Sequence, residues 1–139
     1  MMYKMINTLD SMMGYQNDAA ARIDDVANLI AARLSVLIIA TAASMFSRSL
    51  GRRAFFTAIS QGRNHKSPNA GFPEAAFAGA LGVRLGGPNI YHGKLVDKPY
   101  INAEFNDPVP VHIERACELL LLSALVSLAL GCILARILV

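Results

Sequence analysis

The chain contains two apolar segments, and the second of them has no polar face. Neither 34–47 nor 119–135 holds a charged residue. A helix that is apolar all round is buried in a large core or in lipid, and 139 residues cannot build a large core. Arginines at the edges of both segments can extend toward the interface, so each segment can reach the roughly 20 residues that a span needs. We therefore expect an all-α integral membrane protein, with membrane helices at 27–47 and 117–137. The alternative is a small soluble protein with two buried core helices.

The segment between the two apolar helices is polar, glycine-rich and basic. Residues 48–116 hold nine lysines and arginines but five acidic residues. The positive-inside rule predicts that this segment is cytoplasmic. We expect one domain over 1–139, placed as a multi-pass protein in the cell (inner) membrane and in contact with membrane lipid. Basic clusters interleaved with aromatic residues are absent, so the sequence predicts no binding to nucleic acid.

The chain pattern also predicts local elements. Methionines and leucines on one face predict an amphipathic helix that ends near Gly14, and a second helix starts around Ala19. A short helix over 54–60 is expected, then a helix over 73–85 that begins at Pro73. Small residues spaced four apart in that helix favour close helix packing. Residues 91–110, with three prolines, are expected to be a loop.

The polar block 63–91 carries the residues that suit phosphate or carboxylate chemistry. Cationic and amide side chains can bind phosphate, and the carboxylate of Glu74 can bind a metal or move a proton, with His65 beside it as a second candidate. Simpler interpretations remain open: the glycines can serve packing alone, His65 can be a solvated loop residue, and Glu74 can stabilise the helix dipole. The same dipole argument applies to the acidic pair in the second helix. The candidate binding residues are Arg63, Lys66, Asn69, Arg84 and Asn89, and the candidate metal ligands are Asp24 and Asp25.

The run GRNHKSPNAGFPEAAFAGALGVRLGGPNIYHG resembles the C-terminal signature of the adenosylcobinamide-phosphate synthase family of cobalamin biosynthesis. YKMINTLDSMMGYQND and ARIDDVANLIAARL resemble the segments that precede this signature in the family, in the same order. The resemblance implies an integral membrane carbon–nitrogen ligase. Its substrates are adenosylcobyric acid (a corrinoid), an aminopropanol phosphate or related amino alcohol, and ATP with Mg²⁺. Chemistry then assigns the phosphates to Arg63, Lys66 and Arg84, and Mg²⁺ or the proton to Glu74, Asp24 and Asp25.

The chain differs from the family pattern in length. Family members are about twice as long, so we expect this chain to correspond to the C-terminal half, with a shortened connection at Asp18–Ala19. The alternatives are a non-catalytic corrinoid-binding or assembly component, acting with a separate N-terminal half or as a homo-oligomer, and a related membrane sensor. Topology also stays open. If 34–47 spans the membrane, Asp24 and Asp25 lie on the face opposite to the polar block, and they share a site with it only if that segment is re-entrant or tilted.

Overall fold

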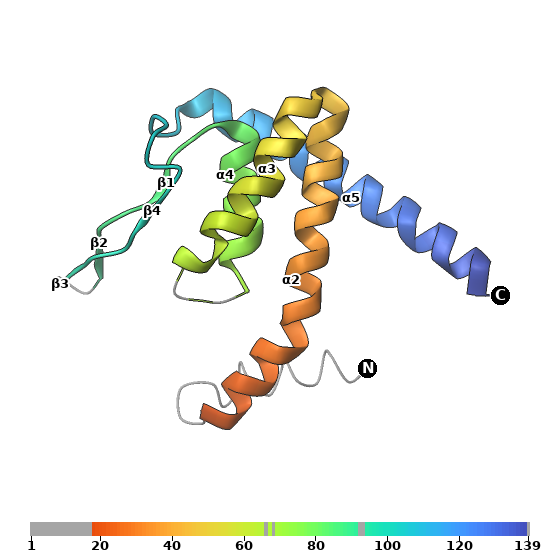
Figure 1. Cartoon of the computed structure of the whole chain (residues 1–139), viewed down its shortest axis with the longest axis horizontal. Coiled ribbons are helices and arrows are strands. Elements are labelled where there is room, and N and C mark those ends of the chain that lie inside the picture. The colour runs from red at the N-terminus through yellow and green to blue at the C-terminus, as the bar shows by residue number, and fades with distance from the viewer. Residues whose placement is uncertain (1–17, 66, 68, 92–93, 139) are drawn as a thin grey trace.

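The computed structural model describes residues 18–65, 67, 69–91 and 94–138, and most of them are helical (Figure 1). The amphipathic helix expected before Gly14 lies outside these residues. The elements in chain order are α2 (Asp18–Phe46), α3 (Arg48–Gln61), the 3₁₀ turn η1 (Gly62–Asn64), α4 (Gly71–Leu81), β1 (Leu85–Gly86), β2 (Asn89–Tyr91), β3 (Lys94–Val96), β4 (Tyr100–Ile101) and α5 (Pro110–Leu138).

The chain reverses direction at the end of α2. Ser47 alone separates α2 from α3, which runs back along α2, and α4 packs against both helices (Figure 1). The polar segment that follows α3 therefore returns toward the N-terminal part of α2. The start of the polar block, up to the first turn of α4, and the N-terminal part of α2 therefore lie toward the same end of the bundle, while 34–46 is a continuous part of α2.

Small side chains form the interface between these three helices. The expected close packing of α4 through Ala75, Gly79 and Ala80 is confirmed, since all three are buried. A Cβ atom on Gly79 would lie 2.8 Å from the backbone oxygen of Arg53, so only glycine permits this approach. Further buried alanines line α2 and α3: Ala42, Ala43, Ala54 and Ala58.

Helix α4 is shorter than the expected 73–85. It begins at Gly71, two residues before Pro73, and ends at Leu81. Gly82 has a φ of 66°, and its N–H donates to the oxygen of Ala78 at 2.9 Å. This left-handed C-terminal cap ends the helix, because the residue adopts a conformation that no helix continues.

The segment expected to be a loop contains short strands, so the class is not purely all-α. β1 pairs antiparallel with β4 and β2 with β3, in two two-stranded ribbons that extend from the helices (Figure 1). In the first ribbon Leu85 faces Ile101. Strands of two or three residues carry no alternating pattern, and their pairing depends on residues distant in the sequence, so periodicity does not reveal them.

Asn102 joins β4 to the helices. It is 1% exposed and has a φ of 55°. Its amide nitrogen donates to the oxygen of Val83 at 3.4 Å, its amide oxygen accepts from the Thr57 hydroxyl at 3.4 Å, and its backbone N–H donates to Gln61 Oε1 at 2.7 Å. Asparagine suits this position because it tolerates the left-handed conformation and fills the buried polar site.

Replacing Asn102 by alanine is expected to lower the free energy of unfolding by about 2–4 kcal/mol. The change removes buried hydrogen bonds. It also adds the free-energy cost of holding alanine, which has a Cβ atom but no polar side chain, in the left-handed conformation. Asn102→Gly keeps the conformation and should cost about 1 kcal/mol less than alanine. Urea or detergent denaturation measures both, with the exposed Asn106→Ala as the matched control. Equal effects of Asn102→Ala and Asn106→Ala would contradict the structural role.

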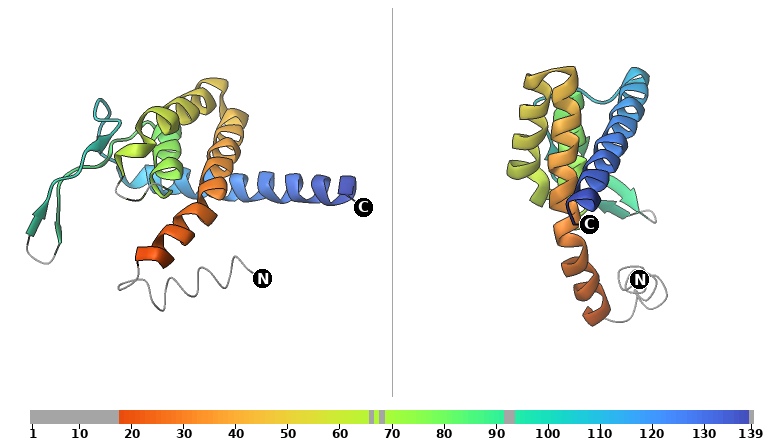
Figure 2. Two further views of the ribbon diagram at one scale, coloured as in Figure 1. Left: turned by 60° about the horizontal axis from the view of Figure 1, so that its bottom comes forward. Right: turned by 90° about the vertical axis from the view of Figure 1, so that its right-hand side faces the viewer.

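Helix α5 is the least buried long element. Within it only Leu119 and Ser123 are buried, and its C-terminal half extends away from the other helices (Figures 1 and 2). Two described helices are long and apolar enough to cross a membrane, Asn28–Phe46 and Pro110–Leu138. Their most apolar stretches are 28% and 11% buried, whereas the core helix of a soluble protein is mostly buried. Exposed apolar surface of this extent is typical of a region that contacts lipid or the apolar surface of another protein.

Candidate functional site

The polar end of the bundle forms where η1 leads through a short connection into α4. Gly62 and Gly71 bring the two elements into contact: a Cβ atom on Gly71 would lie 2.1 Å from the Gly62 oxygen and 2.5 Å from the His65 Cβ. Both glycines are buried. This contact closes the connection and sets the position of His65 beside the first turn of α4.

His65 and Glu74 face each other across this connection. His65 Nε2 lies 3.6 Å from Glu74 Oε2, and the two side chains are 31% and 34% exposed. The N–H of Ser67 donates to His65 Nδ1 at 3.0 Å. Nδ1 also lies 3.4 Å from the Ser67 oxygen, and Nε2 is the ring nitrogen that faces the carboxylate. A partly exposed carboxylate beside an imidazole can accept and pass on a proton.

Helix α2 contributes a cation to the same end of the molecule. Arg33 Nη1 donates to Asn69 Oδ1 at 3.3 Å, and its guanidinium carbon lies 3.8 Å from the centroid of the Phe72 ring. Phe72 precedes Glu74 by two residues on α4. The structure thus brings a residue of the first apolar helix to the polar block, and Asn69 is held there, 9% exposed.

The position of Arg33 at the edge of an apolar segment predicts only an interfacial role for it. It is the single charged residue between Asp25 and Arg48. An ionisable residue inside an apolar helix usually has a specific partner or function, and that signal could have identified it. Its partners Asn69 and Phe72 lie 36 and 39 positions later, beyond the reach of helical spacing.

The other predicted residues lie in different parts of the chain. Arg63 is exposed in η1, at the same end as His65, whereas Asn89 is exposed in β2. Lys66 lies outside the described residues. Asp24 and Asp25 lie in the N-terminal part of α2, at the end toward the polar block, but the structure does not describe their side chains.

Arg84 belongs to the opposite end of α4. Its Nε and Nη2 donate to the carboxylate oxygens of Asp107 at 3.0 and 2.9 Å, and its guanidinium lies 4.8 Å from the Tyr100 ring centroid. Helix α4 rises about 10 Å from Glu74 to Leu81, and Arg84 follows three residues after Leu81. Arg84 therefore lies apart from Arg63, because α4 runs between them.

The carboxylates of the described part do not form a metal centre of their own. No group of three or more His, Cys, Asp or Glu side chains lies together in residues 28–65, 67, 69–89 and 95–138. Mg²⁺ commonly takes one or two protein carboxylates together with phosphate oxygens and water. Glu74 can serve as one such ligand for Mg²⁺ held mainly by a phosphate, and this is the fit that the polar end offers.

The model of one protein family, described as CobD/Cbib protein, matches residues 1–120. A Cobalamin biosynthesis protein CobD of Geobacter metallireducens is 56% identical over 106 residues, which are 71% of this chain and 33% of that protein. The protein of that name from Klebsiella pneumoniae is 44% identical over 137 residues, covering 94% and 43%. One from Rhodobacter capsulatus is 47% identical over 124 residues, covering 84% and 38%. No solved structure matches. The chain thus spans about two fifths or less of these relatives' length.

Proposed function

The chain belongs to the CobD/Cbib protein family, and on this premise we propose that it acts in cobalamin biosynthesis, as part of an ATP-dependent ligase. The reaction joins adenosylcobyric acid to aminopropanol phosphate and yields adenosylcobinamide phosphate. The observation that carries the proposal is that the family match covers the whole polar end, including Arg33, His65 and Glu74. The membrane is the proposed location, because the two apolar helices are largely unburied.

Amide formation from a carboxylate requires activation and proton removal. The carboxylate of the corrinoid acid takes the γ-phosphoryl group of ATP, giving an acyl phosphate and ADP. The amine then attacks the acyl carbon, phosphate leaves, and the nitrogen loses a proton. Glu74 is the proposed acceptor of that proton, with His65 Nε2 beside it at 3.6 Å.

Phosphate groups need cations as they accumulate charge. Arg33 and Arg63 are the described arginines at the polar end, and Arg33 is held in place by Asn69 and Phe72. We assign phosphate binding to these two, with Lys66 as a further candidate from the sequence. Mg²⁺, when bound with ATP, neutralises phosphate charge, and Glu74 or the acidic pair of α2 would hold it.

Membranes that contain the chain test this proposal directly. With adenosylcobyric acid, aminopropanol phosphate and MgATP, they should form the amide only when ATP is present. The chain spans 33–43% of the length of these relatives. The assay is therefore run with the chain by itself and again with the remaining part of a relative supplied as a separate chain. Absence of product in both assays would contradict the ligase proposal.

The short match favours a second candidate, a non-catalytic corrinoid-binding or assembly component. Equilibrium binding of adenosylcobyric acid without ATP-dependent amide formation would support it. Restoration of turnover by the separate N-terminal part would exclude it, because the chain would then take part in catalysis.

The hairpin of α2 and α3 predicts the accessibility of introduced cysteines in sealed vesicles. Asn28 and Asn64 lie toward one end of the bundle and Ser49 at the other, so single cysteines at 28 and 64 should react alike with an impermeant maleimide. A cysteine at Ser49 should react from the opposite side of the membrane. The native Cys117 and Cys132 are free and exposed, and both are replaced by serine beforehand.

Opposite labelling of positions 28 and 64 would show that the hairpin does not return across the membrane. It would also place the acidic pair of α2 away from Glu74 and remove it from the proposed site. Labelling of all three positions from one side would contradict a spanning α2.

A further inference from the structure

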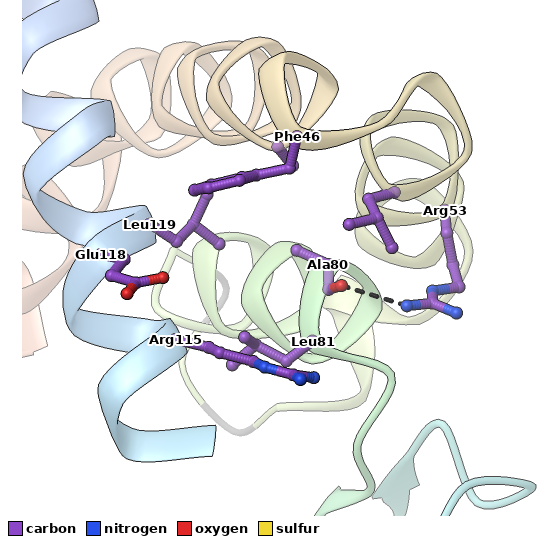
Figure 3. Close-up of a pocket in the computed structure, with 9 residues that line it drawn as sticks. Phe46, Arg53, Ala80, Leu81, Arg115, Glu118 and Leu119 are labelled. Atoms are coloured by element: carbon purple, nitrogen blue, oxygen red, sulfur yellow. Dashed lines mark hydrogen bonds between the residues drawn. The ribbon is translucent and has the colours of Figure 1, made fainter. Parts of the chain in front are cut away.

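Four helices line a half-open cavity of about 260 Å³ at the end of the bundle opposite to the His65–Glu74 pair. Phe46, which lines it, follows Arg33 by 13 residues on α2, or about 20 Å of helix. Figure 3 shows its wall. Apolar side chains from each helix make up most of it: Ala43, Phe46, Leu50, Ala80, Leu81 and Leu119. Three charged side chains complete it: Arg53, Arg115 and Glu118.

The two arginines of this cavity differ in what they bind. Arg53 donates from Nε to the Gly79 oxygen. It also donates from Nη2 to the Ala80 oxygen at 3.0 Å, so it is engaged at the C-terminal end of α4 (Figure 3). Arg115 is exposed on α5 and makes no hydrogen bond or ion pair with another residue of the described chain. Glu118 lies three residues further along α5 and reduces the positive charge in part. Arg115 is therefore the cation that remains available to a ligand.

The cavity lies at the level where both apolar helices meet charged residues. On α2 the apolar span ends at Phe46, and Arg48 follows. On α5 the uncharged stretch begins at Leu119, directly after Glu118. If these helices span a bilayer, this level is the interface between acyl chains and head groups. Basic pockets at that level bind phosphate-bearing lipid head groups.

We propose that this cavity binds an anionic phospholipid, with its phosphate on Arg115 and an acyl chain against Phe46, Leu50 and Leu119. The apolar wall suits a ligand with a hydrocarbon part, and the exposed guanidinium of Arg115 can bind an anion beside it. A phospholipid carries both at this depth. The inference rests on the proposed membrane location and is independent of the ligase chemistry.

A fluorescence experiment can test the site, because the sequence contains no tryptophan. Phe46→Trp places a single indole in the cavity wall in place of another aromatic ring. The variant is reconstituted in phosphatidylcholine. Phosphatidylglycerol with brominated acyl chains is added in one titration and phosphatidylcholine with brominated acyl chains in another, and the quenching of the indole is compared. Half-maximal quenching should require about fivefold less of the anionic lipid, as one basic group near a membrane surface contributes. Equal quenching by the two lipids overturns the proposal.

Variants in the Phe46→Trp background locate the anion. Arg115→Gln should remove the fivefold preference, whereas Arg115→Lys should retain it. Arg136→Gln, which neutralises an exposed arginine at the far end of α5, should leave it unchanged. A preference that survives Arg115→Gln overturns the assignment.

Two further measurements separate the possible failures. Inorganic phosphate at millimolar concentration should not displace the anionic lipid, and displacement would identify a site for free phosphate instead of a lipid. Flotation with liposomes tests the membrane location itself. If the chain floats but shows no lipid preference, only the proposed lipid site is contradicted. If the chain does not float, the membrane location is contradicted.

Discussion

Replacing Gly71 by alanine is expected to cause a large loss of stability, because the added methyl group meets backbone. The new Cβ would lie 2.1 Å from the backbone oxygen of Gly62 and 2.5 Å from the Cβ of His65. Both neighbours are backbone or directly attached to it, so relief requires that η1 and α4 separate. Overpacking of this kind costs about 1–3 kcal/mol, and a backbone clash belongs at the upper end of that range.

The separation should also affect the site, since His65 keeps its position beside Glu74 only while the two elements touch. The expected result is a lower denaturation midpoint together with reduced product formation. Gly131→Ala is the matched control, because a Cβ there meets nothing within 4 Å. As a change within a helix, it should be neutral or stabilise by about 0.5–1 kcal/mol. If both substitutions have the same effect on the midpoint, the contact between Gly62 and Gly71 does not hold the site together.

Glu74→Gln is expected to have the largest effect on turnover. If its carboxylate accepts the proton of the attacking amine, the amide cannot replace it, and product formation should fall by roughly 100-fold to 10,000-fold. The initial rate of amide formation in membranes measures the effect. Corrinoid binding, measured separately, should stay within twofold of the parent, because glutamine has nearly the same shape.

Two companion variants make this prediction specific. His65→Asn combined with Glu74→Gln should be no slower than Glu74→Gln alone, since the pair acts as one unit. Arg84→Ala should retain most of the turnover, because its partner is Asp107 at the opposite end of α4. A loss of turnover in Arg84→Ala equal to that in Glu74→Gln would return Arg84 to the site and contradict the separation seen in the structure.

Much of the helical framework could be predicted from short-range pattern. The apolar segments became α2 and α5, and the small residues of 75–80 became the close-packed face of α4. These features repeat every three or four residues, and helical periodicity is a local property of the chain. The boundaries were less accurate, because Gly82 ends α4 through a cap that a glycine permits but does not require.

The composition of the site was predictable only in part. His65, Asn69 and Glu74 were identified from residue type and position in the polar block, and the structure places them at one end of α4. Arg33 was missed as a member of that end, and Arg84 lies at the other end of α4, where it pairs with Asp107. Both errors concern which residues meet in space, which residue type does not decide.

The sequence alone therefore determined which segments are apolar helices, which block carries the polar chemistry and which family the pattern resembles. The tertiary structure decided which ends come together. The reversal at Ser47 returns α3 along α2 and brings Asn69 and Phe72 to Arg33, while the length of α4 keeps Arg84 apart. These outcomes depend on helix lengths and on close contacts between backbones far apart in the chain. Such contacts form only when the helices pack, and no local pattern encodes them.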